Sequence, residues 1–376
     1  MARILFVSSE GMVGGAETSL LLLIKYLRAG FSVAVACPAP SPLSRALHAE
    51  HIDVHDIPAR PAVSFSRTRY GLYALAVMRR LRRIIVEAGV DLVHANSFYA
   101  GAAALGAART TRRPVVLHAR DLADFGILTW LLSFGAERII AVSRTVKRAL
   151  TATGAAPTKI DVVYNGFDID ACRPPHSPDG APTRPKPQRN GNFVFAHVGQ
   201  FIPWKNHRAF LEAAAYVARR LPRSRFAIVG DDLFGRDASY KATLRRAART
   251  CSAAEKIQFW GWRTTMEAVW PEIDCLVHPA TGEPFGRVIV EAMAHQVPVI
   301  AVATGGPAEI IRADRTGVLV PTPEPRALGE AMLRMARDNE FAATIAAAGY
   351  RRALSTFTAG RTAGRVRRIY NDILSR

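Results

Sequence analysis

Residues 4–37 read ILFVSSEGMVGGAETSLLLLIKYLRAGFSVAVAC and show how the chain begins to fold. The first apolar run predicts a short buried strand at 4–8, and a glycine-bearing turn separates it from an expected helix at 16–29. The apolar run at 31–37 predicts the next strand. A strand, a helix and a second strand in this order are typical of a parallel, doubly wound α/β sheet.

The same alternation continues along most of the chain and predicts the α/β class. In the first half, further strands are expected at 91–95, 115–118, 138–142 and 160–164, with helices at 99–109 and 144–153. In the second half, strands are expected at 193–197, 225–229, 257–259, 275–278, 299–302 and 318–320, with helices at 208–220 and 238–251. Two Rossmann-like domains follow from this pattern.

The stretch ACRPPHSPDGAPTRPKPQRNG at 171–191 interrupts the alternation between the two halves. It holds six prolines and has no hydrophobic period, which is the composition of a linker. We therefore expect a first domain at 1–170, a Pro-rich linker at 171–191 and a second domain at 192–355. The remaining segment, 356–376, predicts an amphipathic helix.

Length and charge limit the classes of function. The chain has 376 residues, which corresponds to about two domains. Its hydrophobic fraction of 49% excludes a disordered or collagen-like chain. The formal net charge is +19, because 50 Lys and Arg residues stand against 31 Asp and Glu residues. This excess favours an anionic partner (nucleic acid, anionic lipid or a phosphorylated small molecule) or reflects a generally arginine-rich composition.

Cysteine spacing and hydropathy indicate the compartment. The four cysteines, Cys37, Cys172, Cys251 and Cys275, show neither zinc-binding nor redox-pair spacing, so reduced thiols and a cytoplasmic location are expected. The N-terminus does not resemble a signal peptide. No window approaches the roughly 18 apolar residues that span a bilayer. We expect a protein that is soluble or lies peripherally on a membrane.

Much of the positive charge is concentrated in one segment, 65–86, which carries six arginines and no acidic residue. Apolar residues such as Leu72 and Leu75 are interleaved with the arginines. A basic helix with an apolar face is typical of a membrane-surface element, although an ordinary packed helix with a solvated face fits the same pattern. The region from Arg351 onward adds seven arginines against one acidic residue, Asp372. An anionic membrane is favoured over nucleic acid, for which no binding motif is found.

The glycine-bearing turn after the first strand matches no nucleotide cofactor motif. Gly11, Gly14 and Gly15 do not form GxGxxG, and the second strand ends in Cys37 with no acidic residue for a ribose. The P-loop motif GxxxxGK[ST] is also absent. A glycine turn before a helix either brings backbone N–H groups close to an anion or sugar, or is a tight turn without a ligand.

The strongest functional signal is HPATGEPFGRVIVEAMAHQVPVIAVATGGPAEI at 278–310. Glu283 lies in a loop after an expected strand, and Glu291 lies about one turn inside the helix that follows. The helical repeat does not stack these two positions, so the carboxylates can contact different parts of one elongated ligand. Glu283 and the N–H groups of Phe285 and Gly286 would contact one end, while Glu291 would accept hydrogen bonds from a diol such as a ribose.

Two further features are expected at the carboxyl edge of the second sheet, where open α/β sheets bind ligands. Gly305 and Gly306 precede a helix that has Pro307 in its first turn, and such a helix end favours a phosphate. Lys205 follows the first strand of the second domain and would neutralise a diphosphate. Each feature alone fits an ordinary turn, whereas their combination favours a ligand site.

These motifs resemble the retaining glycosyltransferases of family GT4, also called glycosyltransferase group 1, which have the GT-B fold. The stretch from Glu283 to Glu291 is similar to the family's paired glutamates, which are separated by seven residues. Further similar stretches are GGAE at 14–17, YNG at 164–166, VGD at 229–231, FWG at 259–261 and GGPAEI at 305–310. The resemblance implies two domains that face each other across a cleft, with the C-terminal helix packing back on the N-terminal domain.

Carried over residue by residue, the resemblance also implies a set of site residues. His118 and Glu283 would be catalytic, both close to the transferred sugar. Lys205 would pair with the diphosphate, Glu291 would hold the ribose, and Trp262 would lie near the base. The donor-binding residues are then Gly15, Lys205, Trp262, Phe285, Gly286, Arg287, Glu291, Gly305 and Gly306. The sequence departs from the family at Gln200, where an Arg is usual; Arg208 and Arg287 are candidates for the missing cation.

The implied activity is that of a retaining hexosyltransferase in polysaccharide biosynthesis. It would move a sugar from a UDP- or GDP-sugar donor to a hydroxyl of a lipid-linked or cell-surface glycan precursor, at the inner face of an anionic membrane. Neither a metal, nor any other cofactor, nor nucleic acid is expected. Two alternatives stay open: a nucleotide-sugar 2-epimerase of the same fold, and a non-catalytic relative that binds a membrane or a partner.

Overall fold

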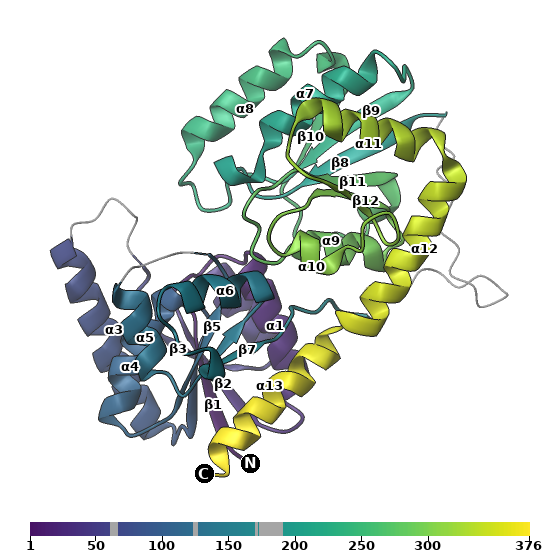
Figure 1. Cartoon of the computed structure of the whole chain (residues 1–376). Helices are drawn as coiled ribbons and strands as arrows, with labels where there is room; N and C mark the ends of the chain where they lie inside the picture. The colour runs from purple at the N-terminus through teal and green to yellow at the C-terminus, as the bar shows by residue number, and fades with distance from the viewer. Residues whose placement is uncertain (61–66, 123–126, 170–171, 173–190) are drawn as a thin grey trace. The chain divides into compact units, whose positions relative to one another are not determined.

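A computed structural model describes residues 1–60, 67–122, 127–169, 172 and 191–376. The chain divides into two compact units (Figure 1). The first unit contains residues 1–166 together with 359–376, and the second contains 167–358. Most of the expected linker at 171–191 lies outside the described residues.

The first unit is built on a seven-stranded sheet in the order β3-β2-β1-β4-β5-β6-β7, and all of its pairings are parallel. Its strands are β1 (Arg3–Val7), β2 (Ser32–Cys37), β3 (Asp53–Asp56), β4 (Leu92–Ala95), β5 (Val115–Ala119), β6 (Arg138–Ala141) and β7 (Ile160–Val162). Its helices are α1 (Gly15–Leu27), α2 (Pro42–Ala49), α3 (Arg67–Glu87), α4 (Phe98–Thr110), α5 (Ile127–Gly135), α6 (Arg144–Ala152), the 3-10 turn η1 (Pro157–Lys159) and α13 (Ala359–Leu374).

The second unit has a six-stranded parallel sheet in the order β10-β9-β8-β11-β12-β13. Its strands are β8 (Phe193–Val198), β9 (Ser224–Val229), β10 (Ile257–Gly261), β11 (Cys275–His278), β12 (Val299–Val302) and β13 (Val318–Val320). Its helices are α7 (His207–Ala218), α8 (Ala238–Thr250), α9 (Arg287–Ala294), α10 (Pro307–Ile310), α11 (Pro325–Arg337), α12 (Asn339–Thr356) and the 3-10 turns η2 (Pro203–Lys205), η3 (Ala254–Lys256) and η4 (Trp270–Glu272).

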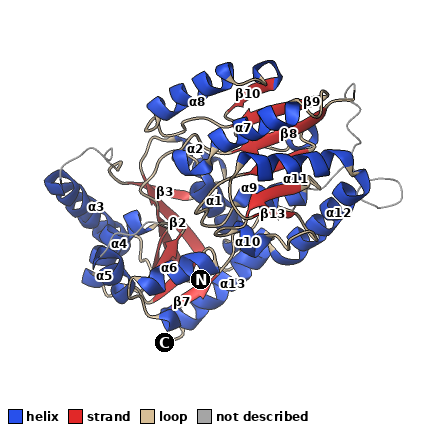
Figure 2. Cartoon of the chain, turned by 45° about the horizontal axis from the view of Figure 1, so that its top comes forward, coloured by secondary structure: helices blue, strands red, loops and turns tan. Residues whose placement is uncertain are grey.

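Burial explains why the central strands are apolar along their whole length. Every residue of β4, β5, β11 and β12 is buried, because helices pack against both faces of a parallel sheet (Figure 2). In the first unit the C-terminal helix α13 completes the core, with Val366 and Tyr370 in one apolar cluster with Leu20 and Leu27 of α1. The second unit has its own apolar cluster around Phe195 and Phe226.

The predicted α/β class and the two parallel sheets are confirmed, but sequence patterns specified no helix for α11 or α12 and also missed β3, α2 and α5. The strand β3 reads DVHD, and its polar residues gave no apolar signal because it is the edge strand of the sheet. The helix α2 begins at a Ser41 cap and is short, and α5 reads ILTWLLSFG, an apolar run without a helical period. In the part of the chain that the structure describes, no helix is long and apolar enough to cross a membrane.

Candidate active site

The strand order of the second unit places a ligand crevice beside β8. The order reverses there, since β9 lies on one side of β8 and β11 on the other, and open α/β sheets bind ligands outside the carboxyl ends of strands at such a point. Lys205 ends the turn η2 after β8, and Glu283 lies in the loop after β11. Gly305 and Gly306 follow the next strand, β12.

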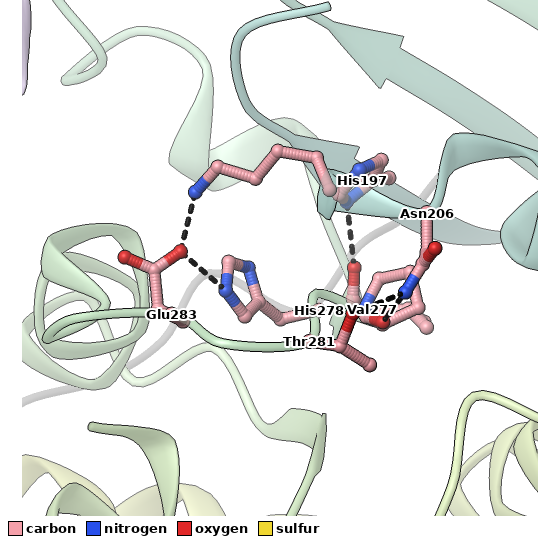
Figure 3. A network of polar contacts seen from close by, with 8 residues as sticks. His197, Asn206, Val277, His278, Thr281 and Glu283 are labelled. Atoms are coloured by element: carbon pink, nitrogen blue, oxygen red, sulfur yellow. Dashed lines mark hydrogen bonds and ion pairs between the residues drawn. The ribbon is translucent and has the colours of Figure 1, made fainter. Parts of the chain in front are cut away.

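The structure brings Lys205 and Glu283 into direct contact. The Lys205 ammonium donates to Glu283 Oε2 at 2.5 Å, and the two side chains are only 12% and 9% exposed. The same carboxylate oxygen lies 3.2 Å from Nε2 of His278, the last residue of β11, and Figure 3 shows this contact. His278 was not among the predicted site residues, although it lies only five residues before Glu283.

The contacts with Lys205 and His278 keep the Glu283 carboxyl ionised. Burial raises the pKa of this carboxyl, but the positive charge of Lys205 and the hydrogen bond with His278 outweigh burial and hold the pKa well below its usual range. Burial lowers the pKa of His278 despite the nearby carboxylate, so the imidazole is neutral and its Nε2–H donates to Glu283. A buried carboxylate and a buried ammonium therefore neutralise each other in the free site.

A short left-handed turn positions Lys205 against the loop after β11. Asn206 has a φ of 54°, and its side-chain amide donates to Pro279 O at 3.0 Å and to Thr281 Oγ1 at 3.2 Å (Figure 3). Asn tolerates this backbone conformation better than most residues. The turn after β8 and the loop after β11 are thereby tied together on either side of the Lys205–Glu283 pair.

The two glycines after β12 lie against the loop that holds Glu283. The N–H of Gly306 donates to the Glu283 carbonyl at 2.8 Å. A Cβ on Gly306 would lie 2.1 Å from the Phe285 carbonyl oxygen, and one on Gly305 (φ 67°) would lie 2.3 Å from the Glu283 carbonyl oxygen. Only glycine permits this approach. The N–H of Gly306 is therefore already used, and α10 is a helix of four residues.

The second carboxylate of the motif, Glu291, also has a cationic partner. Gly286 is the N-cap of α9 with a φ of 100°, and Arg287 is the first residue of that helix. The Arg287 guanidinium donates to Glu291 Oε1 at 2.8 Å, one turn further along. Of the two cations considered as replacements at Gln200, Arg208 is 83% exposed and pairs with Glu212, whereas Arg287 is 16% exposed.

Trp262 lies in a separate hollow of the second unit. This pocket has a volume of about 720 Å³ and is formed by the end of β10 and the segment that follows it. Trp260, Trp262 and Arg263 line it, and Trp260 donates from its indole N–H to Gln258 at 3.1 Å. The volume of the pocket lies within the range of small-molecule pockets.

Two predicted site residues, Gly15 and His118, belong to the first unit. Gly15 is the exposed first residue of α1, and the N–H of the preceding Gly14 donates to the buried Glu17 carboxylate at 3.2 Å. His118 lies on β5, is fully buried, and lines a small pocket with Arg120. In the described residues no group of three or more His, Cys, Asp or Glu side chains is arranged to hold a metal.

Sequence profiles of two known families match the chain. The family described as "Glycosyltransferase Family 4" matches residues 13–171, and the family described as "Glycosyl transferases group 1" matches residues 182–352. The two matched regions together account for most of both units.

Individual relatives agree with the family matches. The D-inositol 3-phosphate glycosyltransferase of Mycobacteroides abscessus is 31% identical over 57% of this chain, and the match spans about half (48%) of that protein. The UDP-Gal:alpha-D-GlcNAc-diphosphoundecaprenol alpha-1,3-galactosyltransferase of Escherichia coli is 25% identical over 69% of each chain. The crystal structure of Anabaena Alr3699/HepE in complex with UDP-glucose has 27% sequence identity and a TM-score of 0.85, and the alignment covers 99% of this chain and 100% of that one. The chain therefore belongs to glycosyltransferase family 4 and has the GT-B fold.

Proposed function

We propose that the protein is a retaining hexosyltransferase that moves a sugar from a UDP- or GDP-sugar to a hydroxyl of a lipid-linked glycan precursor. The observation that carries this proposal is the buried Lys205–Glu283 pair at the strand-order reversal of the second unit. The name of the Escherichia coli relative and the ligand of the HepE structure contain UDP, which supports testing UDP-sugars first.

The donor can enter this site by an exchange of partners. In the free protein each carboxylate is paired with a cation, Glu283 with Lys205 and Glu291 with Arg287. A nucleotide sugar carries hydroxyls that donate hydrogen bonds and phosphates that only accept them. Hydroxyls of the sugar and the ribose would donate hydrogen bonds to the two carboxylates in place of the cations. The released Lys205 and Arg287 side chains would then pair with the diphosphate. No buried charge is left unpaired in either state.

In the sugar-transfer step, these charged side chains stabilise the charges that develop on the donor. As the bond between the sugar C1 and the phosphate oxygen breaks, positive charge develops on the sugar ring and negative charge on the departing β-phosphate. Lys205 and Arg287 stabilise the phosphate, and Glu283 stabilises the ring. The acceptor hydroxyl attacks C1 on the face that the phosphate leaves, and its proton passes to a phosphate oxygen. The new bond keeps the anomeric configuration of the donor.

Arg287 is the better candidate for the cation that Gln200 does not supply. It directly follows the Glu283–Gly286 loop, and its side chain is largely buried. The N–H of Gly306 donates to the Glu283 carbonyl and is therefore not available to the phosphate that was predicted to bind at 305–306. The phosphate would then be bound by side-chain cations. Two cations rather than one would then neutralise the diphosphate.

We place the lipid-linked acceptor at an anionic membrane surface because of the first unit's outer helices. Arg79, Arg82 and Arg83 of α3 are exposed. On α5, Trp130 and Phe134 are exposed and their rings stack, with centroids 5.9 Å apart. The helices α3, α4 and α5 lie side by side (Figure 1). Exposed aromatic rings and arginines are typical of proteins that bind anionic lipid.

The activity is tested by incubating the chain with radiolabelled UDP- and GDP-sugars and a bacterial lipid extract. Label transferred to the lipid phase in an α linkage from an α-linked donor supports the proposal. Release of an epimerised free sugar identifies a 2-epimerase instead. Binding of neither nucleotide identifies a non-catalytic relative and contradicts the proposed function.

Membrane binding is tested by sedimentation with anionic and with neutral vesicles. We expect binding to anionic vesicles only, and we expect Arg79→Gln/Arg82→Gln/Arg83→Gln to lose most of it. The matched control removes three exposed arginines of α8, Arg245, Arg246 and Arg249. Equal losses in both triple variants would show that total charge, and not the α3 surface, controls binding.

A further inference from the structure

A chain of buried polar side chains runs through the first unit, from the C-terminal helix to His118. Tyr370 Oη on α13 lies 2.6 Å from His94 Nδ1 on β4. His94 Nε2 lies 3.1 Å from His118 Nδ1 on the neighbouring strand β5. The Arg120 guanidinium, two residues beyond His118, lies 3.3 Å from the same His118 Nδ1. All of these partners belong to one compact unit.

Arg120 determines the direction of the hydrogen bonds. A guanidinium has only donors, so Nδ1 of His118 must accept. His94 also contacts that nitrogen, and it must therefore donate from its Nε2–H. A neutral imidazole carries one proton, which leaves Nδ1 of His94 as an acceptor for the Tyr370 hydroxyl. Arg120 is itself held by Asn96 Oδ1 at 2.8 Å and Asn165 Oδ1 at 2.9 Å.

The electrostatics of the cluster agree with neutral rings. Burial, together with the positive charge of Arg120, lowers the pKa of both His94 and His118 well below the ordinary value. Burial raises the pKa of Tyr370 well above its usual range, so the hydroxyl keeps the proton that it donates. The protonation that the geometry requires is therefore also the one that burial favours.

The free end of the chain of hydrogen bonds is the Nε2–H of His118. In the described part of the protein this atom is buried and has no hydrogen-bond partner. His118 lines a pocket of about 10 Å³ together with Ser19, Arg120 and Asn165. That volume is enough for about one oxygen atom with its hydrogens. A buried N–H without a partner costs free energy, which an accepting oxygen would recover.

We propose that Tyr370 and His94 are positioning residues that hold His118 as a neutral Nε2–H donor, aimed at an accepting oxygen of a bound sugar or phosphate. His118 then orients the ligand and cannot act as a base, because its one available lone pair, on Nδ1, is occupied by two donors. The identity of the ligand rests on the proposed function, whereas the protonation of the two rings does not.

The protonation is tested by NMR on the full chain labelled with ¹⁵N-histidine, with long-range ¹H–¹⁵N correlations that distinguish the two tautomers. We expect His94 and His118 to be neutral and protonated on Nε2 at pH 7. His197 provides an internal control, since its Nδ1 lies 3.1 Å from the Val277 carbonyl and must carry its proton there. A His118 ring protonated on Nδ1, or on both nitrogens, overturns the proposal.

The Tyr370 link is tested in the same spectrum. Tyr370→Phe removes only the hydroxyl, so the Nδ1 resonance of His94 should move toward that of a nitrogen without a hydrogen bond, while His197 stays in place. Tyr216→Phe, which removes a hydroxyl that contacts Glu330 on the surface of the second unit, should leave His94 unchanged. An unmoved His94 resonance in Tyr370→Phe would contradict the relay.

The ligand role is tested by the separate affinities for a nucleotide sugar and for the free nucleotide. His118→Ala should weaken binding of the nucleotide sugar about tenfold, the value of one hydrogen bond, and His118→Gln, whose amide N–H reaches a similar point, should retain most of the affinity. A loss confined to the nucleotide sugar assigns the contact to a sugar oxygen, and a loss shared by the free nucleotide assigns it to a phosphate oxygen. Equal losses in both variants refute the donor role. If the chain binds no nucleotide sugar, the proposed function fails and the NMR result alone decides the relay.

Discussion

Replacing Lys205 by Met should destabilise the second unit far more than an ordinary surface charge would. The Glu283 carboxylate has two described partners, Lys205 and His278. The substitution leaves this carboxylate buried and keeps only its hydrogen bond with His278. Removing one partner of a buried ion pair costs about 3–5 kcal/mol, and the remaining His278 hydrogen bond places the expected loss at the lower end of this range, about 3 kcal/mol. For a unit of this size, that corresponds to a fall in melting temperature of roughly 6–12 °C in scanning calorimetry.

The second unit also provides the matched control. Arg208 and Glu212 form an exposed pair on α7, and Arg208→Met should cost no more than about 0.5 kcal/mol. The double variant Lys205→Met/Glu283→Gln should regain much of the loss, because no uncompensated charge remains buried. Equal melting temperatures for Lys205→Met and Arg208→Met, or a double variant as unstable as Lys205→Met, would refute the reasoning.

Three further predictions concern the glycine contact, the buried histidines and the ribose. Gly306→Ala should displace the loop that holds Glu283 and severely weaken nucleotide binding in calorimetric titration. As a control, Gly364→Ala on α13, where a Cβ meets nothing within 4 Å, should stabilise the protein by about 0.5–1 kcal/mol. Unchanged nucleotide binding in Gly306→Ala would argue against the contact. Burial lowers the pKa of His207 from 6.5 to about 3, so below about pH 6.5 the unfolded chain binds a proton that the folded protein does not. The free energy of unfolding, measured in urea, should then decrease by up to about 1.4 kcal/mol for each unit by which the pH is lowered between about 6.5 and 3. His207→Phe should reduce this dependence on pH. Glu291→Gln should weaken UDP or GDP binding about tenfold but hardly change the affinity for the 2′,3′-dideoxy nucleotide; equal losses for both nucleotides would exclude a ribose contact.

Sequence patterns predicted the strands that frame the site, because these strands are buried on both faces and read as apolar runs. The strand β11 was predicted with its observed bounds, and the loop and helix after it follow from the motif around Glu283. The polar edge strand β3 was missed for the opposite reason, since only its packing partner β2 makes it a strand.

The polar contacts of the site could not be predicted from local patterns. Lys205 and Glu283 are 78 residues apart, and their pairing depends on the adjacency of β8 and β11. Tyr370 and His94 are 276 residues apart and meet only because α13 packs in the first unit. A sequence shows which residues carry suitable chemistry, whereas the fold determines which of them share a hydrogen bond.

Titration calorimetry with UDP and GDP tests the central claim, that the second unit binds a nucleotide diphosphate through Lys205, most directly. We expect saturable binding of at least one nucleotide to the unmodified chain and to Arg208→Met, and binding at least about tenfold weaker to Lys205→Met at a temperature where all three remain folded. Binding of neither nucleotide to the unmodified chain, or equal affinities in all three proteins, would contradict it.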